Sequence, residues 1–160
     1  MKHRILALFA LAPLAPAWAQ DPAAPTATAV PDMIVTATRI PTPRDRIPAP
    51  VTVIDRQTIQ ENGYVTLADA LAAVPGFRLV QAGGLGQQAS GFARGANSRQ
   101  VLVLMNGVPI NDPSEPNGAF NFGNELLGDI ERIEVVRGPV SSLYGSAAIG
   151  GVINLITRSA

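Results

Sequence analysis

Short runs of β-branched and apolar residues, separated by turns, most restrict what this chain can fold into. From Ala49 onward such runs alternate with two segments of helical pattern, which is typical of an α+β domain. All fifteen glycines lie after residue 62, whereas seven of the fourteen prolines lie between residues 21 and 50. The sequence therefore predicts a proline-rich leader followed by an α+β unit, a small mixed β-sheet with short helices and long loops.

The turn and cap residues place the elements of this unit. Thr66 is expected to cap a helix over 66–76, with Asp69 at its third position and Pro75-Gly76 as its stop. Asn106-Gly107 supplies the two positive-φ residues of a tight hairpin turn. One or two helical turns are expected over 56–63. The strands are expected at 49–55, 77–81, 100–110 (both arms of the hairpin), 130–139 and 152–157.

The first nineteen residues have the pattern of a secretory signal peptide. A basic start is followed by an apolar stretch from Ile5 and by the small-x-small sequence Ala17-Trp18-Ala19. The alternative, a membrane anchor, needs about 20 apolar residues and is disfavoured by Pro13 and Pro16. Cleavage is expected after Ala19, which makes the chain an exported protein.

Residues 20–45 are predicted to be a flexible tether that contains one strand-forming segment. Residues 21–31, DPAAPTATAVP, lack the large apolar side chains that folding needs. The following DMIVTATR, residues 32–39, is rich in β-branched and apolar residues and is flanked by Pro31 and Pro41. No local segment is expected to pair with it.

The residue inventory excludes several classes of function. Removal of residues 1–19 leaves ten basic against twelve acidic residues, removes the single histidine, and the chain has no cysteine. A nearly neutral chain lacks the excess of positive charge that is typical of nucleic-acid-binding proteins. Zinc sites of the Cys/His type, thiol catalysis and Ser-His pairs are also excluded. We therefore expect neither an enzyme nor a resident cofactor.

Two long irregular loops are expected at 82–91 and 111–124. Loops of this length in a small domain are usually functional or mobile, and both are rich in amides, which suits a neutral polar ligand. The first contains a formal dinucleotide fingerprint from Gly84, but the glycines that follow it argue against the helix that a pyrophosphate site requires. Asp112 and Glu115 are too few oxygen ligands to predict a calcium site.

Several segments together resemble one family. MIVTATR, TLADALAAVPGF, FARG, VLVLMNGVPI and IERIEVVRGPVSSLYGSAAIGGVINLIT are similar, in this order and spacing, to the plug domain of TonB-dependent outer-membrane receptors. The resemblance runs from about Asp32 to Thr157, and among these receptors it is nearest to the vitamin B12 transporter type. It implies a plug domain over 46–157.

The resemblance also implies roles for individual residues. A TonB box, which adds as a strand to the TonB energy-coupling protein, would be Asp32, Met33, Ile34, Val35, Thr36 and Ala37; the alternative is a linker or a first strand of the domain. Substrate contacts would come from Gln87, Gln88, Ser90, Asn111, Asp112, Asn117, Phe120 and Asn121, unless these are ordinary surface loops. Arg94 and Arg137 would form a latch to acidic residues of a barrel wall, unless they extend to water or use Glu134 as partner.

In such receptors the last plug strand continues into a barrel of about 22 strands. Residues 158–160 would be the start of that barrel, which would be the receptor's own C-terminal part or the product of a split gene. The implied ligand is cobalamin or a ferric siderophore. The location would be the outer membrane with a barrel and the periplasm without one. The alternative is a free-standing periplasmic interaction module that keeps the plug fold without transport.

Overall fold

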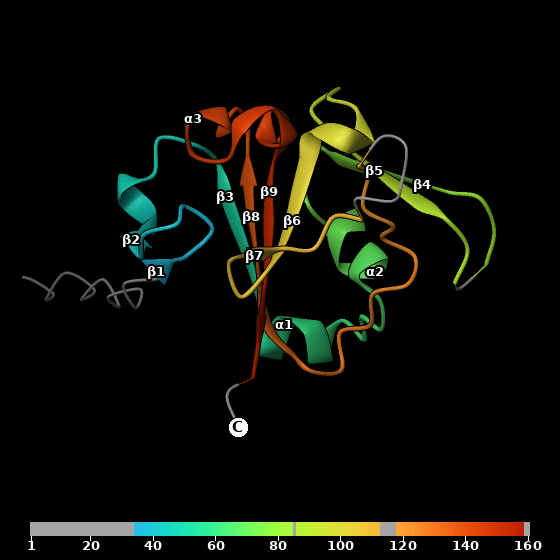
Figure 1. The fold of residues 1–160 in the computed structure, drawn as a ribbon. Coiled ribbons are helices and arrows are strands. Elements are labelled where there is room, and N and C mark those ends of the chain that lie inside the picture. Colours follow the sequence, from blue (N-terminus) through green and yellow to red (C-terminus); the bar gives the residue numbers. More distant parts are fainter. Residues whose placement is uncertain (1–33, 85, 113–117, 159–160) are drawn as a thin grey trace, which may run out of the picture.

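The computed structural model describes residues 34–84, 86–112 and 118–158. Five strands form one mixed sheet at the centre of the molecule, in the order β3-β8-β9-β6-β7 (Figure 1). Only β6 and β9 run parallel, and the other neighbours are antiparallel. The strands are β3 (Val51–Asp55), β6 (Val101–Met105), β7 (Val108–Pro109), β8 (Ile130–Arg137) and β9 (Gly151–Thr157). The predicted α+β class with a small mixed sheet is confirmed.

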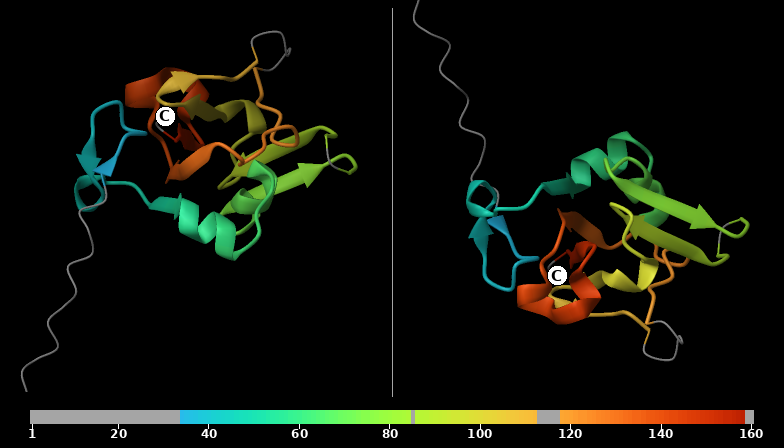
Figure 2. Two further views of the ribbon diagram at one scale, coloured as in Figure 1. Left: turned by 90° about the horizontal axis from the view of Figure 1, so that it is seen from below. Right: turned by 90° about the horizontal axis from the view of Figure 1, so that it is seen from above.

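Two smaller sheets flank the central one on opposite sides (Figures 1 and 2). One pairs β4 (Phe77–Gln81) with β5 (Ala89–Ala93), and the other pairs β1 (Ile34–Val35) with β2 (Thr42–Pro43). The expectation of a loop over all of 82–91 is wrong for residues 89–91, which belong to β5. A Cβ atom at Gly91 would lie 2.6 Å from the Phe77 ring, so the absence of a side chain lets the aromatic cluster close over this strand.

The helices begin at side-chain caps. The Asp55 carboxylate accepts from the Thr58 N–H at the start of α1 (Arg56–Glu61). At α2 (Leu67–Ala72) the predicted capping box of Thr66 and Asp69 is confirmed. The short α3 (Ser141–Tyr144) was not predicted, and 3-10 turns span Arg44–Arg46, Ser98–Gln100 and Gly145–Ala148. None of the helices in the described part of the chain has the length and apolar character needed to cross a membrane.

Both faces of the central sheet are buried, against two separate apolar clusters. Successive side chains of a strand point to opposite faces. Ile133 and Val135 of β8 therefore join the cluster beneath α1 and α2, whereas Val136 joins a second cluster with Val35 and Ala37. By the same alternation, Glu134 of β8 and Asn154 of β9 lie on the face of the second cluster, where two polar side chains have no exposure.

Candidate site at the N-terminal segment

The N-terminal segment that was predicted to lack a local partner is folded against the sheet. Ile34 and Val35 pair with Pro43 and Thr42, and Val35 and Ala37 have no exposed surface. Arg39 adopts a left-handed backbone conformation with φ 67°, which reverses the chain so that β2 returns beside β1. The predicted tether is therefore wrong for residues 34–45. The signal peptide, the remainder of the tether, Asp32 and Met33 lie outside the described residues.

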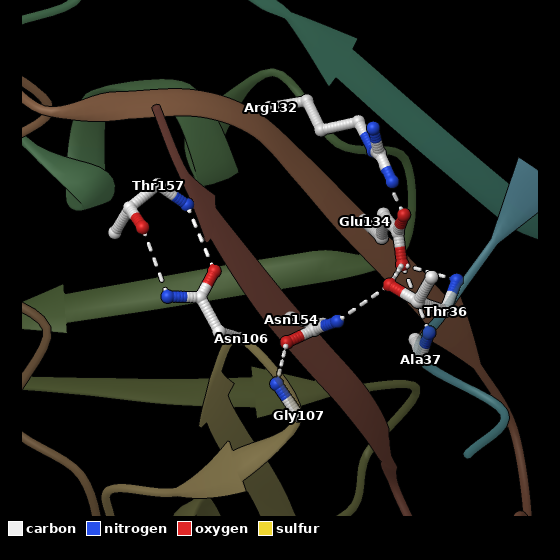
Figure 3. Close-up of polar contacts among 8 residues, drawn as sticks. All are labelled: Thr36, Ala37, Asn106, Gly107, Arg132, Glu134, Asn154 and Thr157. Carbon is white, nitrogen blue, oxygen red and sulfur yellow. Dashed lines mark hydrogen bonds and ion pairs between the residues drawn. The ribbon is translucent and has the colours of Figure 1, made fainter. Parts of the chain in front are cut away.

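The carboxylate of Glu134 accepts four hydrogen bonds, three of which hold this segment (Figure 3). Its Oε2 atom accepts from the Thr36 N–H at 2.8 Å, the Ala37 N–H at 2.9 Å and the Thr36 hydroxyl at 3.0 Å. Its Oε1 atom accepts from Arg132 Nε at 2.9 Å. A buried charge is tolerated only when it is paired and hydrogen-bonded. The fold of the sheet thus depends on donors from a segment nearly a hundred residues away in sequence.

Asn154 continues the polar network toward the hairpin turn. It lies opposite Glu134 in the register of β8 and β9. Its Nδ2 atom donates to the Thr36 hydroxyl at 3.0 Å, and its Oδ1 atom accepts from the Gly107 N–H at 3.0 Å. Beside it, the Asn106 side chain accepts from the Thr157 N–H and donates to the Thr157 hydroxyl (Figure 3). Both turn residues of the hairpin are therefore tied to β9.

The rim of this site carries positive charge. The Arg39 guanidinium lies 4.7 Å from the centre of the Tyr144 ring, within the range of a cation–π contact. Burial raises the pKa of the Tyr144 hydroxyl, although the positive charge of Arg39 acts in the opposite direction. Thr36, Arg39, Gly107 and Arg132 border a cleft of about 620 Å³ between the N-terminal segment and the hairpin turn.

The structure brings the two predicted substrate loops together. The Asn121 side chain accepts from the N–H groups of Ala89 and Gly123, and the Phe122 N–H donates to the Ala89 carbonyl. A Cβ atom at Gly123 would lie 2.0 Å from the Gln87 carbonyl oxygen, so the loops touch closely. Gln87, Gln88 and Asp112 are exposed, and Ser90 is half-buried on β5 rather than on a loop.

Two further residues of the predicted substrate set have structural contacts. Phe120 is buried in the core, where its ring packs edge-to-face on Phe122. In this structure its ring makes a packing contact and is not presented to a ligand. Asn111 accepts from the Val103 N–H and donates to the carbonyls of Val101 and Gly118, which fixes the start of the second loop on β6. Asn117 lies outside the described residues.

The two predicted latch arginines converge on the turn after α2. The Arg94 N–H donates to the Gly76 carbonyl, and the Arg94 side chain is exposed. Arg137 is half-buried, donates to the Pro75 carbonyl and keeps a buried Nε atom without a partner among the described residues. The alternative that either arginine uses Glu134 is wrong, because Arg132, Thr36 and Ala37 occupy that carboxylate.

A signal for the Glu134 site is present in the sequence, although the motifs alone do not include it. Glu134 lies within the apolar run Ile133 to Val136, and an acid in such a run is typical of a buried carboxylate with specific donors. What these residues can do chemically is bind an extended main chain through its N–H groups. Within the described ranges, no group of three or more metal-binding side chains occurs.

Comparison with known proteins identifies the family. The model of the TonB-dependent receptor plug domain matches residues 43–152. The vitamin B12 transporter BtuB of Vibrio vulnificus is 47% identical over 127 residues, which are 79% of this chain. The chain spans only 20% of the length of that relative.

Solved receptor structures share the fold. The siderophore receptor PiuA of Acinetobacter baumannii superposes with a TM-score of 0.60 at 31% identity, over 74% of this chain and 16% of that chain. The ferripyoverdine receptor of Pseudomonas aeruginosa superposes with a TM-score of 0.65 at 23% identity, over 79% of this chain and 16% of that chain, and supports the fold alone. The chain belongs to the TonB-dependent receptor plug domain family.

Proposed function

We propose that this chain is the plug part of an outer-membrane receptor for energised uptake of cobalamin or a ferric siderophore. The observation that carries the proposal is the extended segment that includes residues 34–37, which pairs with β2 beside the central sheet and donates two main-chain N–H groups to Glu134. The 47% identity to a vitamin B12 transporter favours cobalamin as the ligand. Transport, rather than catalysis, is the activity in which the chain would take part.

Residues 32–37 are the proposed TonB box. In strand addition, main-chain hydrogen bonds provide affinity and alternate side chains fix the register. The N–H groups of Thr36 and Ala37 now donate to Glu134. Because a donor cannot serve Glu134 and a partner strand together, the closed segment is not ready for strand addition. Coupling therefore requires that residues 36–37 leave Glu134.

The remaining roles follow from the same proposal. The paired loops around Gln87, Gln88 and Asn121 would contact the ligand together with loops of a receptor barrel. Arg94 and Arg137 would face acidic residues of the barrel wall. Residues 1–19 would direct export, and the assembled receptor would lie in the outer membrane. The chain without a barrel would remain in the periplasm.

A peptide of residues 30–40 tests the proposed box, because strand addition needs an extended segment and no folded domain. The peptide should bind the periplasmic domain of the TonB protein in a calorimetric titration. The same peptide with Val35→Pro should not bind, since proline cannot donate to a ladder. Equal binding of both peptides, or of neither, would show that residues 32–37 are a linker.

A further inference from the structure

Asn154 is a wholly buried carboxamide that connects two segments far apart in the sequence. Its side chain accepts a hydrogen bond from the Gly107 N–H, in the turn between β6 and β7, and donates one to the Thr36 hydroxyl of the N-terminal segment. An amide in this position is costly unless both of its ends are paired. The turn and the N-terminal segment therefore both bond to Asn154, and each pairs one end of its side-chain amide.

The contacts form one continuous chain of hydrogen bonds (Figure 3). The Gly107 N–H donates to Asn154, Asn154 donates to the Thr36 hydroxyl, and this hydroxyl donates to Glu134. A hydroxyl has one proton, so its donation to Glu134 leaves it an acceptor for Asn154. If the bond at one end of this series is lost, a buried polar group of the next residue is left without a partner. The hydrogen bonds therefore stabilise one another.

At the surface a cleft separates the N-terminal segment from the turn, although Val35 and Ala37 share a buried apolar cluster with Leu104 of β6. Thr36 and Arg39 on one side, and Gly107 and Pro109 on the other, border the cleft of about 620 Å³. The turn is held on its other side by a two-residue strand, β7. Pro109 in this strand has no N–H to donate. After β7 the chain is anchored again to β6, through the Ile110 N–H and the Asn111 side chain.

We propose that Asn154 couples the β6–β7 turn to the N-terminal segment, so that movement of the turn releases the N–H groups of Thr36 and Ala37. The functional meaning of this release rests on the proposed role of residues 32–37. The physical coupling itself is a property of the folded chain. Coupling between two sites is reciprocal in free energy, so a change at either segment should be measurable at the other.

Amide hydrogen exchange on the chain from Gln20 onward tests the coupling from both ends. Thr36→Val removes the hydroxyl from the half-buried N-terminal side and should raise exchange at Gly107 by about fivefold or more. Asn154→Leu should raise exchange at Gly107 and also at Thr36 and Ala37. Thr157→Val removes a different bond between β9 and the same turn but leaves the Gly107–Asn154 bond in place, so exchange at Thr36 and Ala37 should rise less than in Asn154→Leu.

Protection of the Ile153 amide in the centre of the sheet reports whether each variant remains folded. If Asn154→Leu loses this protection, the variant is unfolded, and the coupling is then tested only by comparing exchange at Gly107 in Thr36→Val and wild type. Unchanged exchange at Gly107 in Thr36→Val would overturn the coupling. A rise at Thr36 and Ala37 in Thr157→Val as large as in Asn154→Leu would also overturn it, because the release would then not pass through Asn154. These results are independent of peptide binding to TonB, so the two proposals fail separately.

Discussion

The absence of a side chain at Gly123 allows the two predicted substrate loops to lie in close contact. A Cβ atom there would lie 2.0 Å from the Gln87 carbonyl oxygen, whereas one at Gly128 would meet nothing within 4 Å. Gly123→Ala should therefore lower the free energy of unfolding by about 2–3 kcal/mol, as an overpacked site does. Gly128→Ala should change it by less than about 0.5 kcal/mol. Urea denaturation of both variants checks this, and equal midpoints would contradict the close contact of the loops.

Asp69 gives the helix cap a dependence on pH. Hydrogen bonds from Thr66, first from its backbone N–H, hold the pKa of the Asp69 carboxyl below its ordinary value. A group with a lowered pKa in the folded state stabilises the fold above its unfolded pKa, and this contribution is lost as pH falls through the folded pKa. Wild-type stability should thus fall below about pH 4 more steeply than that of Asp69→Ala. Asp45→Ala, an equal change of charge at an exposed turn, is the control, and equal slopes for both variants would rule out the cap as a cause.

At the scale of an element, the β6–β7 turn depends on Asn106 for both its backbone and its side chain. Asn106 has φ 50°, and its side chain makes two hydrogen bonds to Thr157. Asn106→Ala loses the bonds and strains the backbone, so it should cost about 2 kcal/mol. Asn106→Gly loses the bonds but suits the conformation, so it should cost about 1 kcal/mol. Thermal unfolding of the pair separates the two contributions, and a larger loss for the glycine variant would contradict this division.

The elements also show what the sequence could predict. The strands of the central sheet, β4, the Thr66 cap and the Asn106-Gly107 turn depend on neighbouring residues, and their positions were predicted correctly. The pairing of β1 and its burial were missed, because they depend on Glu134, which is 98 residues from Thr36. β5 was missed because Ser90 and Gly91 have weak strand propensity, and only the Phe77 and Phe122 rings around Gly91 explain its place.

At the scale of the whole molecule, the two latch arginines differ in how much they contribute to the isolated fold. Arg94 is exposed, so Arg94→Ala should cost less than about 1 kcal/mol. Arg137 is half-buried and donates to the Pro75 carbonyl, so Arg137→Ala should cost about 1–2 kcal/mol. Urea midpoints test both values. A loss above about 3 kcal/mol for Arg94→Ala would mean that it stabilises the plug itself, and its role as a latch to a barrel would have to be abandoned.

In the whole molecule, the proposed coupling segment is closed on a buried carboxylate. Glu134→Gln removes the charge that accepts the Thr36 and Ala37 N–H groups, whereas Glu131→Gln makes the same change at an exposed position of β8. Neutralising the acceptor weakens charge-assisted bonds, so the closed segment should open more often and apparent affinity for a partner strand should rise.

The most direct test is a calorimetric titration of the chain from Gln20 onward with the periplasmic domain of TonB. Wild type and Glu131→Gln should bind at least about tenfold more weakly than the peptide of residues 30–40, because the segment must first leave Glu134. Glu134→Gln should recover much of this difference. Equal affinities for the peptide, the wild-type chain and Glu134→Gln would contradict a segment held closed by Glu134.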